Sequence, residues 1–179
     1  MKCPSIIVDL EGTCFDDQSI PDSEREIIEF GAVALSGLES RGEFAMFVRP
    51  HRHPTITNFC RGLTGICQEH LNAARSFPEV FANFQGFCWD CGELSAFASW
   101  GTYDRDAIAR DCRYHQILNT FTQHFDLSKV FGKHTGRRMG HRRAMKHLGI
   151  EPDGRQHRGI DDTRNIVKIV REFYRKGWL

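Results

Sequence analysis

Asp9 and Glu11 lie two residues apart at the end of a short apolar run, residues 5–10, that is rich in β-branched side chains. Such a run is typical of a buried strand, and because side chains alternate across a strand, both carboxylates project from the same face. Two neighbouring carboxylates repel each other unless cations lie between them, and divalent metals bind carboxylate oxygens. The pair therefore indicates a metal site, although Asp-x-Glu also occurs by chance in the solvated loop after a strand.

Asp104 stands near the start of a predicted helix over residues 103–115. On a helical wheel it aligns with the side chains expected to pack on the sheet, which are Ile108, Cys112 and His115. The outward side of that helix carries Asp106, Arg110 and Arg113. An inward acid at this position is a candidate metal ligand, and the alternative is that Asp104 only caps the helix.

His157 and Asp162 flank the start of the last predicted helix, over residues 161–176. Asp162 shares a helical face with three apolar residues that must be buried, which are Ile166, Ile169 and Phe173. Its neighbour Asp161 is predicted to face outward with Asn165 and Lys168, as a first-turn acid that the helix dipole favours. His157 lies just before the helix, where an imidazole with a pKa near neutrality could take a proton from water.

Four inward carboxylates and one histidine are the groups that two-metal hydrolysis of a phosphodiester requires. In that chemistry two cations about 3.5–4 Å apart activate a water molecule and stabilise the leaving oxygen. The joint pattern is much more specific than any of its parts, and it predicts a nuclease.

The elements that must position these groups follow from hydrophobic periodicity and from the places of Gly and Pro. Strands are predicted over residues 5–10, 27–35, 43–48 and 94–99, the first three as an antiparallel meander. Helices are predicted over residues 63–74, 78–88, 103–115, 137–148 and 161–176. Strands first and helices later, with one strand between helices, predict a mixed α/β layer fold, and the length suits a single domain over residues 1–179.

Composition narrows the class of protein. Seven cysteines, an odd number in a chain of 179 residues, are expected to be reduced thiols in a cytoplasmic protein. No secretory signal is expected before the first apolar run, and no membrane contact, since no apolar stretch approaches the ~20 residues of a bilayer span. Residues 129–176 hold 14 Lys and Arg against 5 Asp and Glu, whereas the rest of the chain holds 10 against 18. This basic segment suits a polyanionic partner, or it is only a set of solvated helix faces.

Three motifs carry a family resemblance: DLEGT at residues 9–13, YD at 103–104 and His-x4-Asp at 157–162. In this order they resemble the motifs of the histidine-type DEDD (DEDDh) exonucleases, which are DnaQ-like enzymes with an RNase H-like fold. Other segments resemble the enhanced-RNAi and KapD-like branch, namely EGTC at 11–14, IEFGAV at 28–33, VRP at 48–50, FC at 59–60, LTGI at 63–66 and DGR at 153–155. The resemblance covers nearly the whole chain and implies an exonuclease domain with a central mixed five-stranded sheet flanked by helices.

The resemblance also implies an activity, 3′-to-5′ exonuclease action on single-stranded RNA or DNA ends, with RNA favoured and nucleoside 5′-monophosphates as products. It implies two Mg²⁺ ions, for which Mn²⁺ could substitute. Asp9 would bridge both ions, Glu11 and Asp162 would complete the pair, Asp104 would reach a metal directly or through water, and His157 would be the general base. The residues implied in binding the 3′-terminal nucleotides are Thr13, Phe59, Leu63, Thr64 and Tyr103, among which an aromatic ring could stack a base.

Some alternatives stay open on the sequence. A catalytically silent module that only binds nucleic-acid ends would be expected to lack one of the five site residues, and an RNase H-like endonuclease would lack the His-x4-Asp motif. Cys88-x2-Cys91 and Cys112-x2-His115 have the spacing of a structural zinc site, although Cys112 and His115 also lie on a helix face expected to pack.

Substrate targeting is the part that the resemblance leaves most open. Gly12 stands where relatives in this branch often carry Ala, which should matter little. An accessory nucleic-acid-binding domain, which some relatives carry, is not expected in these residues. The substrate would then be held by the domain's own groove, by a partner, or by a basic stretch that contains Arg137, Arg138, Arg142 and Arg143. A choice between RNA and DNA depends on contacts to the 2′-hydroxyl, which the sequence does not place.

Overall fold

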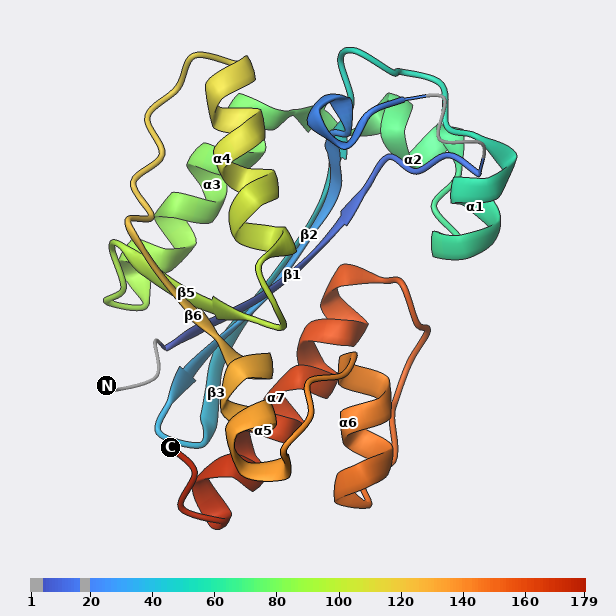
Figure 1. Ribbon diagram of the computed structural model, residues 1–179. Helices are drawn as coiled ribbons and strands as arrows, with labels where there is room; N and C mark the ends of the chain where they lie inside the picture. Colours follow the sequence, from blue (N-terminus) through green and yellow to red (C-terminus); the bar gives the residue numbers. More distant parts are fainter. Residues whose placement is uncertain (1–4, 17–19) are drawn as a thin grey trace.

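The computed structural model describes residues 5–16 and 20–179, and a mixed β-sheet lies at its centre (Figure 1). The strand order is β4-β3-β2-β1-β5-β6. The strands are β1 (Ile6–Gly12), β2 (Ile27–Ser36), β3 (Glu39–Arg49), β4 (Arg75–Ser76), β5 (Ala96–Ser99) and β6 (Gln123–Asp126). The first three form the predicted antiparallel meander, while β4 runs parallel to β3, β5 to β1 and β6 to β5.

The mixed α/β, RNase H-like architecture is confirmed, but the expected number of five strands is wrong because the sheet has six. β4 consists of two residues that pair with Val48 and Arg49 at the end of β3. So short a pairing produces no alternation that a sequence pattern could reveal. β6 also has no clear pattern, since its sequence QHFD mixes polar and aromatic residues at the edge of the sheet.

The α-helices of the described residues differ from the predicted ones mainly at their ends. They are α1 (Asn58–Thr64), α2 (Gln68–Ala73), α3 (Phe77–Asp90), α4 (Tyr103–Tyr114), α5 (Leu127–Thr135), α6 (His141–Leu148) and α7 (Gly159–Arg175). The helix predicted over 63–74 is two short helices, because Gly65 adopts a left-handed conformation with φ of 71° and ends α1. α6 begins only after Gly140, and α5 was not predicted.

Alternation along β1 directs its side chains into two separate cores. Ile6, Val8 and Leu10 pack with α3 and α4 on one face of the sheet, and Ile7 packs with α5, α6 and α7 on the other. Figure 1 shows the same division, with α3 and α4 together on one side and α5, α6 and α7 gathered on the other. Asp9 and Glu11 lie two and four residues after Ile7 on the strand, so their side chains share its face and point to the layer of α7.

A close contact between β2 and the start of α7 brings that helix to the centre of the sheet. A Cβ on Gly31 would lie 2.0 Å from the backbone carbon of Gly159, so the two backbones approach more closely than any side chain would allow. The Thr163 hydroxyl donates a 3.0 Å hydrogen bond to the Gly31 carbonyl oxygen. The first turn of α7, with Asp162, is thereby fixed beside β1.

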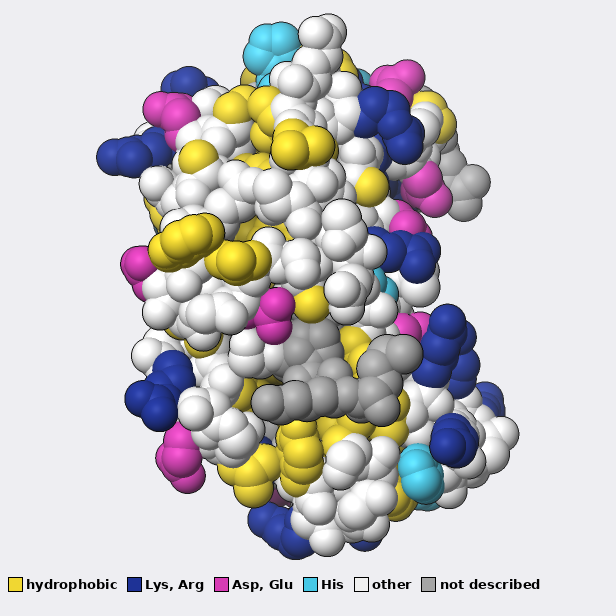
Figure 2. Space-filling model, turned by 90° about the vertical axis from the view of Figure 1, so that its left-hand side faces the viewer, with side chains coloured by type: hydrophobic (Ala, Val, Ile, Leu, Met, Phe, Trp, Pro, Cys, Tyr) yellow, Lys and Arg dark blue, Asp and Glu magenta, His cyan; other side chains and the backbone are white. Residues whose placement is uncertain are grey.

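The side of the molecule formed by α3 and the loops next to β5 carries exposed hydrophobic residues. Figure 2 shows them in several separate groups, with Lys and Arg mainly around the edges of that face. The most exposed large ones are Trp89, Leu94 and Leu118. No helix within the described residues has both the length and the apolar character needed to cross a bilayer.

Candidate active site

Two carboxylates lie on β1, and a third approaches them from α4. Asp9 and Glu11 occupy the carboxyl-terminal half of β1. Asp104 is buried in the first turn of α4, and its Oδ1 accepts a 2.9 Å hydrogen bond from the backbone N–H of Leu10. This bond fixes the Asp104 carboxylate against the strand at the residue between Asp9 and Glu11. Asp104 thus faces inward, as its position on the helical wheel predicts.

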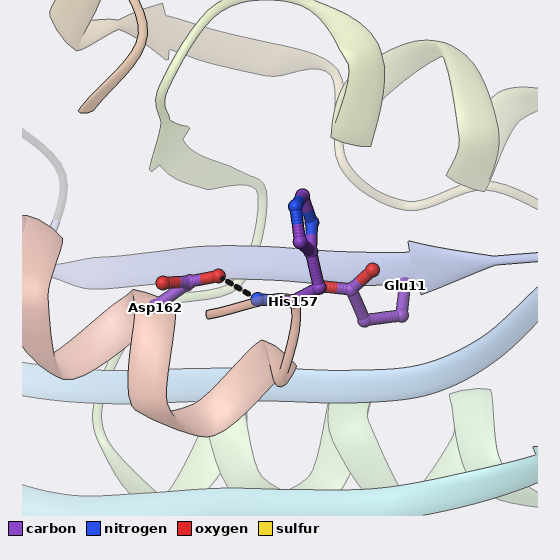
Figure 3. A group of neighbouring side chains, drawn as sticks. All are labelled: Glu11, His157 and Asp162. Atoms are coloured by element: carbon purple, nitrogen blue, oxygen red, sulfur yellow. Dashed lines mark hydrogen bonds between the residues drawn. The ribbon is translucent and has the colours of Figure 1, made fainter. Parts of the chain in front are cut away.

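His157 and Asp162 reach the same place from the loop before α7 and from its first turn. The His157 backbone N–H donates a 2.7 Å hydrogen bond to Asp162 Oδ2, which Figure 3 shows as a dashed line. His157 has a φ of 61°, in the left-handed region that non-glycine residues rarely adopt, so the loop conformation is strained there. One donor atom from each of Glu11, His157 and Asp162 lies within 4.8 Å of the other two. A shared ion could be bound between them.

The choice between the adjacent acids Asp161 and Asp162 follows the helical periodicity. Asp162 is buried, whereas Asp161 is partly exposed and accepts a 3.0 Å hydrogen bond from the backbone N–H of Arg155. The prediction that Asn165 faces outward is wrong. Asn165 is fully buried because its side-chain amide makes two hydrogen bonds with the Asp153 backbone, which fasten the preceding loop to α7.

Three carboxylic acids of the site have raised pKa values. Burial, followed by repulsion from Asp104 and Glu11, raises the pKa of Asp9 well above its ordinary value. Burial and the charge of Asp162 raise the pKa of Glu11 to about 8. Burial raises the pKa of Asp104 to about 6, although hydrogen bonds from Ser99 and Leu10 oppose the shift. Within the described residues, no basic side chain forms an ion pair with any of the three.

Asp162 differs from these three acids because basic groups of α6 already contact it. His141 Nε2 and Arg142 NH2 each lie 3.1 Å from Asp162 Oδ1. Burial favours the neutral acid, but the hydrogen bond and charge of His141 outweigh it and lower the pKa of Asp162 below its ordinary value. Asp162 is therefore the ionised member of the group.

A partly buried ion pair holds the His157 loop to the sheet. Glu29 lies directly opposite Glu11 in the pairing of β1 with β2. Its carboxylate accepts hydrogen bonds of 3.0 to 3.2 Å from the Arg158 guanidinium and one of 2.9 Å from the Gly159 backbone N–H. Since Arg158 directly follows His157, this pair positions the imidazole. Glu29 and Arg158 are 129 residues apart, and no local pattern in the sequence indicated their pairing.

The predicted nucleotide-binding residues divide into exposed and buried ones. The pocket at the carboxylates has a volume of about 240 Å³, and Thr13, Leu63 and Tyr103 line it. Phe59, Leu63 and Tyr103 expose 43%, 37% and 42% of their surfaces. Thr13 and Thr64 are buried, and their hydroxyls bond to backbone groups of Glu26 and Cys60. Thr64 could act on a nucleotide only through the helix end that it fixes.

The same pocket contains two basic residues that the sequence did not single out for it, Arg25 and His141. The predicted helix over 137–148 places His141 in its interior. Because α6 starts at His141 itself, the imidazole lies at the helix terminus, next to Asp162. A correct helix start was the signal needed to identify it.

The four zinc candidates are not brought together. Cys88 and Cys112 are buried in the apolar core of α3 and α4, and the His115 ring stacks on Phe77 at a centroid distance of 5.4 Å. In residues 5–16 and 20–179, one group of three or more His, Cys, Asp or Glu side chains has donor atoms close enough to share an ion, and it is Glu11, His157 and Asp162. The buried thiols serve as small apolar side chains.

Known proteins of similar sequence and structure are nucleases. A family model described as "Exonuclease" matches residues 6–170. ERI1 exoribonuclease 2 of Xenopus laevis is 32% identical over 92% of this chain and 27% of its own length, and human (Homo sapiens) ERI1 exoribonuclease 3 is 31% identical over 97% and 54%. The nuclease domain of 3′hExo, a DEDDh family member bound to rAMP, superimposes with a TM-score of 0.88 at 27% identity, over 96% of this chain and 92% of that one. The chain spans about a quarter and about half of the two curated relatives.

Proposed function

This chain belongs to the exonuclease family, in the ERI1 branch of the DEDDh type, and we propose that it removes nucleotides from the 3′ end of single-stranded nucleic acid. RNA is the proposed preferred substrate, because both curated relatives are named exoribonucleases. The proposed products are nucleoside 5′-monophosphates, the class of compound to which the rAMP bound to the 3′hExo domain belongs.

The observation that carries this proposal is a group of carboxylates for which the described residues provide no cation. Asp9, Glu11 and Asp104 converge, and burial and mutual repulsion raise their pKa values. A fold that holds acids in this way loses stability when they ionise, unless a cation binds. Oxygen ligands of this kind suit Mg²⁺ and Mn²⁺. The donor set therefore fits the divalent ions that the family uses.

The ions would be held by Asp9, Glu11, Asp104 and Asp162. When bound, two Mg²⁺ or Mn²⁺ ions would activate the attacking water and stabilise the leaving oxygen. The chain itself holds the metal-binding carboxylates in position. The bond from Leu10 N–H fixes Asp104, the contact between Gly31 and Gly159 fixes the start of α7, and the bond from His157 N–H fixes Asp162.

His157 is the proposed general base. Its side chain is partly buried, which lowers the pKa of the imidazole below its ordinary value, although Asp162 opposes that shift. The ring is therefore neutral at neutral pH, with one nitrogen free to accept a proton from water. That ring nitrogen lies within 4.8 Å of the carboxylate oxygens of Glu11 and Asp162. The ion pair between Arg158 and Glu29 would keep it there.

The terminal nucleotide would lie beside β1 and α1. Phe59, Leu63 and Tyr103 are the proposed contacts for its base and sugar, because each is exposed and two of them line the pocket. Thr13 and Thr64 would support them by fixing the local backbone.

Action as one domain over residues 1–179 is likewise proposed. So is a cytoplasmic location, which the unpaired cysteines of the described residues support.

The test is cleavage of matched single-stranded RNA and DNA oligomers labelled at the 5′ end. The protein is incubated with each in Mg²⁺, in Mn²⁺ and in EDTA, beside an Asp9→Asn variant. The expected result is a ladder that shortens from the 3′ end, requires metal, is absent for the variant and forms faster on RNA. If folded wild-type protein binds both oligomers and cleaves neither, the enzyme proposal is wrong and a silent end-binding module replaces it. Internal cuts would instead indicate an endonuclease.

A further inference from the structure

A basic groove adjoins the catalytic pocket along α6. Arg142 and Lys146 form one wall, the turn over residues 149–152 forms the other, and the volume is about 380 Å³. Arg142 belongs to both places, because its NH2 group lies 3.1 Å from Asp162 Oδ1 while its side chain lines the groove. Arg142 therefore links the groove to a carboxylate of the candidate active site.

The two cations of this wall differ, because Arg142 already pairs with Asp162 through NH2. Arg142 Nε is buried and has no hydrogen-bond partner. Lys146 is exposed, and none of the acidic side chains in the described part of the chain forms an ion pair with it. The two residues are four apart on one helix, so they lie on the same side of it and are separated by about 6 Å along its axis. Such a pair suits successive negative charges of one extended molecule.

The other basic residues of this segment are placed differently. Arg138 donates to Asp126 Oδ2 at 2.8 Å and to Ser128 Oγ at 2.7 Å, so its charge is compensated within the fold. Arg143 is exposed but does not line the groove. The basic stretch seen in the sequence thus separates into the structural Arg138, the exposed Arg137 and Arg143, and Arg142, which forms the groove wall together with Lys146.

Glu151 makes the two walls of the groove opposite in charge. It lies in the wall opposite α6, and it is exposed. Lys168 donates to the backbone oxygen of Glu151 at 3.0 Å, and within the described residues no basic side chain forms an ion pair with the Glu151 carboxylate. An anion in the groove is attracted by α6 and repelled by this wall, and it would lie against Arg142 and Lys146.

We propose that Arg142 and Lys146 bind backbone phosphates of the substrate strand, upstream of the 3′-terminal nucleotides that occupy the pocket. This inference rests on the proposed exonuclease function and adds the path by which the strand leaves the site. The occupant is a single strand because Arg142 links the groove to Asp162 of the candidate active site and Lys146 lies one turn further along the same side of α6. Phosphate contacts carry no base information, so the groove acts alike on all sequences.

The experiment measures oligomer binding by fluorescence anisotropy, in EDTA so that no cleavage occurs. The variants are R142Q, K146Q and E151Q, with R143Q as a matched control that removes the same charge from the same helix outside the groove. Each protein is titrated with a trinucleotide and with a strand of about 12 nucleotides, over a range of salt concentrations. Circular dichroism checks that each variant is folded.

K146Q and R142Q are expected to weaken binding of the longer strand by roughly 3- to 10-fold and to reduce the salt dependence by about 0.7 per lost contact. E151Q is expected to strengthen binding, and R143Q to leave it unchanged. The trinucleotide should bind K146Q as it binds the wild type, because it does not reach Lys146. Since Arg142 also touches Asp162, K146Q is the cleaner variant for the groove.

Failure of this inference is distinguishable from failure of the exonuclease proposal. If wild-type protein cleaves, but R143Q weakens binding as much as K146Q does, the groove is not the path and the exonuclease proposal stands. The same holds if K146Q affects both oligomers equally. If the groove variants behave as expected but no cleavage occurs with metal, the strand path is supported and the exonuclease proposal is wrong. The protein is then a module that binds nucleic acid without cleaving it. If wild-type protein neither binds nor cleaves, both proposals are wrong.

Discussion

Carboxylates on two strands lie at the same edge of the sheet, the pair Asp9 and Glu11 on β1 and the single Asp126 on β6. In the described part of the chain, only the charge of Asp126 is balanced by donors and a basic side chain of the protein. β1, β5 and β6 are parallel, so their carboxyl ends meet at one edge. Asp9 and Glu11 lie at the end of β1, and Asp126 is the last residue of β6. Glu11 and Asp126 are similarly buried, at 9% and 8% exposure.

Asp126 is surrounded by donors. It accepts hydrogen bonds from Ser128 N–H at 3.0 Å, from Ser128 Oγ at 2.7 Å and from Gly101 N–H at 3.1 Å, and Arg138 lies at 2.8 Å. Burial alone would raise the pKa of Asp126, but these partners lower it below the ordinary value. Asp126 is therefore an ionised residue that caps α5 and stabilises the fold.

Among residues 5–16 and 20–179, no such partners surround Glu11 and Asp9, and their raised pKa values follow from burial and from the neighbouring acids. Asp126, which is matched by donors of its own chain and lies outside the pocket, has a structural role, whereas carboxylates left unmatched at the pocket are prepared for a cation from solution. The comparison assigns Asp126 to the fold and Asp9 and Glu11 to chemistry, although all three lie in the carboxyl-terminal halves of parallel strands.

The largest expected effect separates the two groups directly. Asp9→Asn should lower the cleavage rate by about 10²–10³-fold or more, because it removes a metal ligand worth several kcal/mol to the transition state. The same change should not lower the melting temperature in EDTA, since it removes a charge that its neighbours repel. Single-turnover cleavage and thermal denaturation give the two values. A variant that is inactive because it is unfolded would contradict this assignment.

A second test concerns the proton acceptor beside the unmatched acids. His157→Ala should slow cleavage by roughly 10²-fold or more, the contribution typical of a general base. The wild-type rate should rise with pH up to the imidazole pKa, which lies below the ordinary value, and should then level off. The variant should lose that rise. An unchanged pH profile in His157→Ala would show that another group accepts the proton.

Asp126→Asn is the structural counterpart of Asp9→Asn. It should destabilise the fold by about 1–3 kcal/mol, because Arg138 and the donors around the carboxylate lose a charged acceptor. The cleavage rate per folded molecule should stay close to that of the wild type. Denaturant unfolding measures the first quantity, and cleavage at a temperature where the variant is fully folded measures the second. Loss of cleavage without loss of stability would place Asp126 in the site instead.

The last prediction is a pH dependence of stability that metal removes. The pKa of Glu11 is about 8 in the metal-free fold, above its value of 4.5 in the unfolded chain. The folded state therefore holds the extra proton, and stability should fall as pH rises from about 4.5 to about 8. Mg²⁺ binds the ionised form, so the difference in melting temperature between Mg²⁺ and EDTA should widen over that window. Each kcal/mol corresponds to roughly 2–4 °C. A constant difference would contradict the raised pKa.

The sequence predicts the acids of the candidate active site better than it predicts the structural Asp126, for a physical reason. Asp9 and Glu11 follow from the two-residue alternation of β1, and Asp162 follows from helical periodicity, and both are local patterns. Asp126 lies at the end of an edge strand with no clear pattern, and its cationic partner follows after α5, which was also not predicted. Its role depends on a tertiary contact, as does the pairing of Glu29 with Arg158.

Errors near the site have the same origin. Helical periodicity predicts that Asn165, a polar residue, faces solvent, yet its amide bonds to the Asp153 backbone inside the fold. Periodicity does not identify His141, because the start of α6 depends on Gly140. The sequence therefore predicts which residues carry the chemistry, whereas the contacts that hold them emerge only from the fold.

The most direct test of the central claim is metal binding itself. Metal-free wild type, Asp9→Asn and Asp126→Asn are titrated with Mn²⁺ by isothermal calorimetry, at a pH above the value of about 8 given for Glu11. The expected result is saturable binding by the wild type and by Asp126→Asn, and loss of that binding in Asp9→Asn. Equal binding by all three proteins, or loss in Asp126→Asn alone, would contradict the conclusion that the unmatched carboxylates of β1 are the metal site.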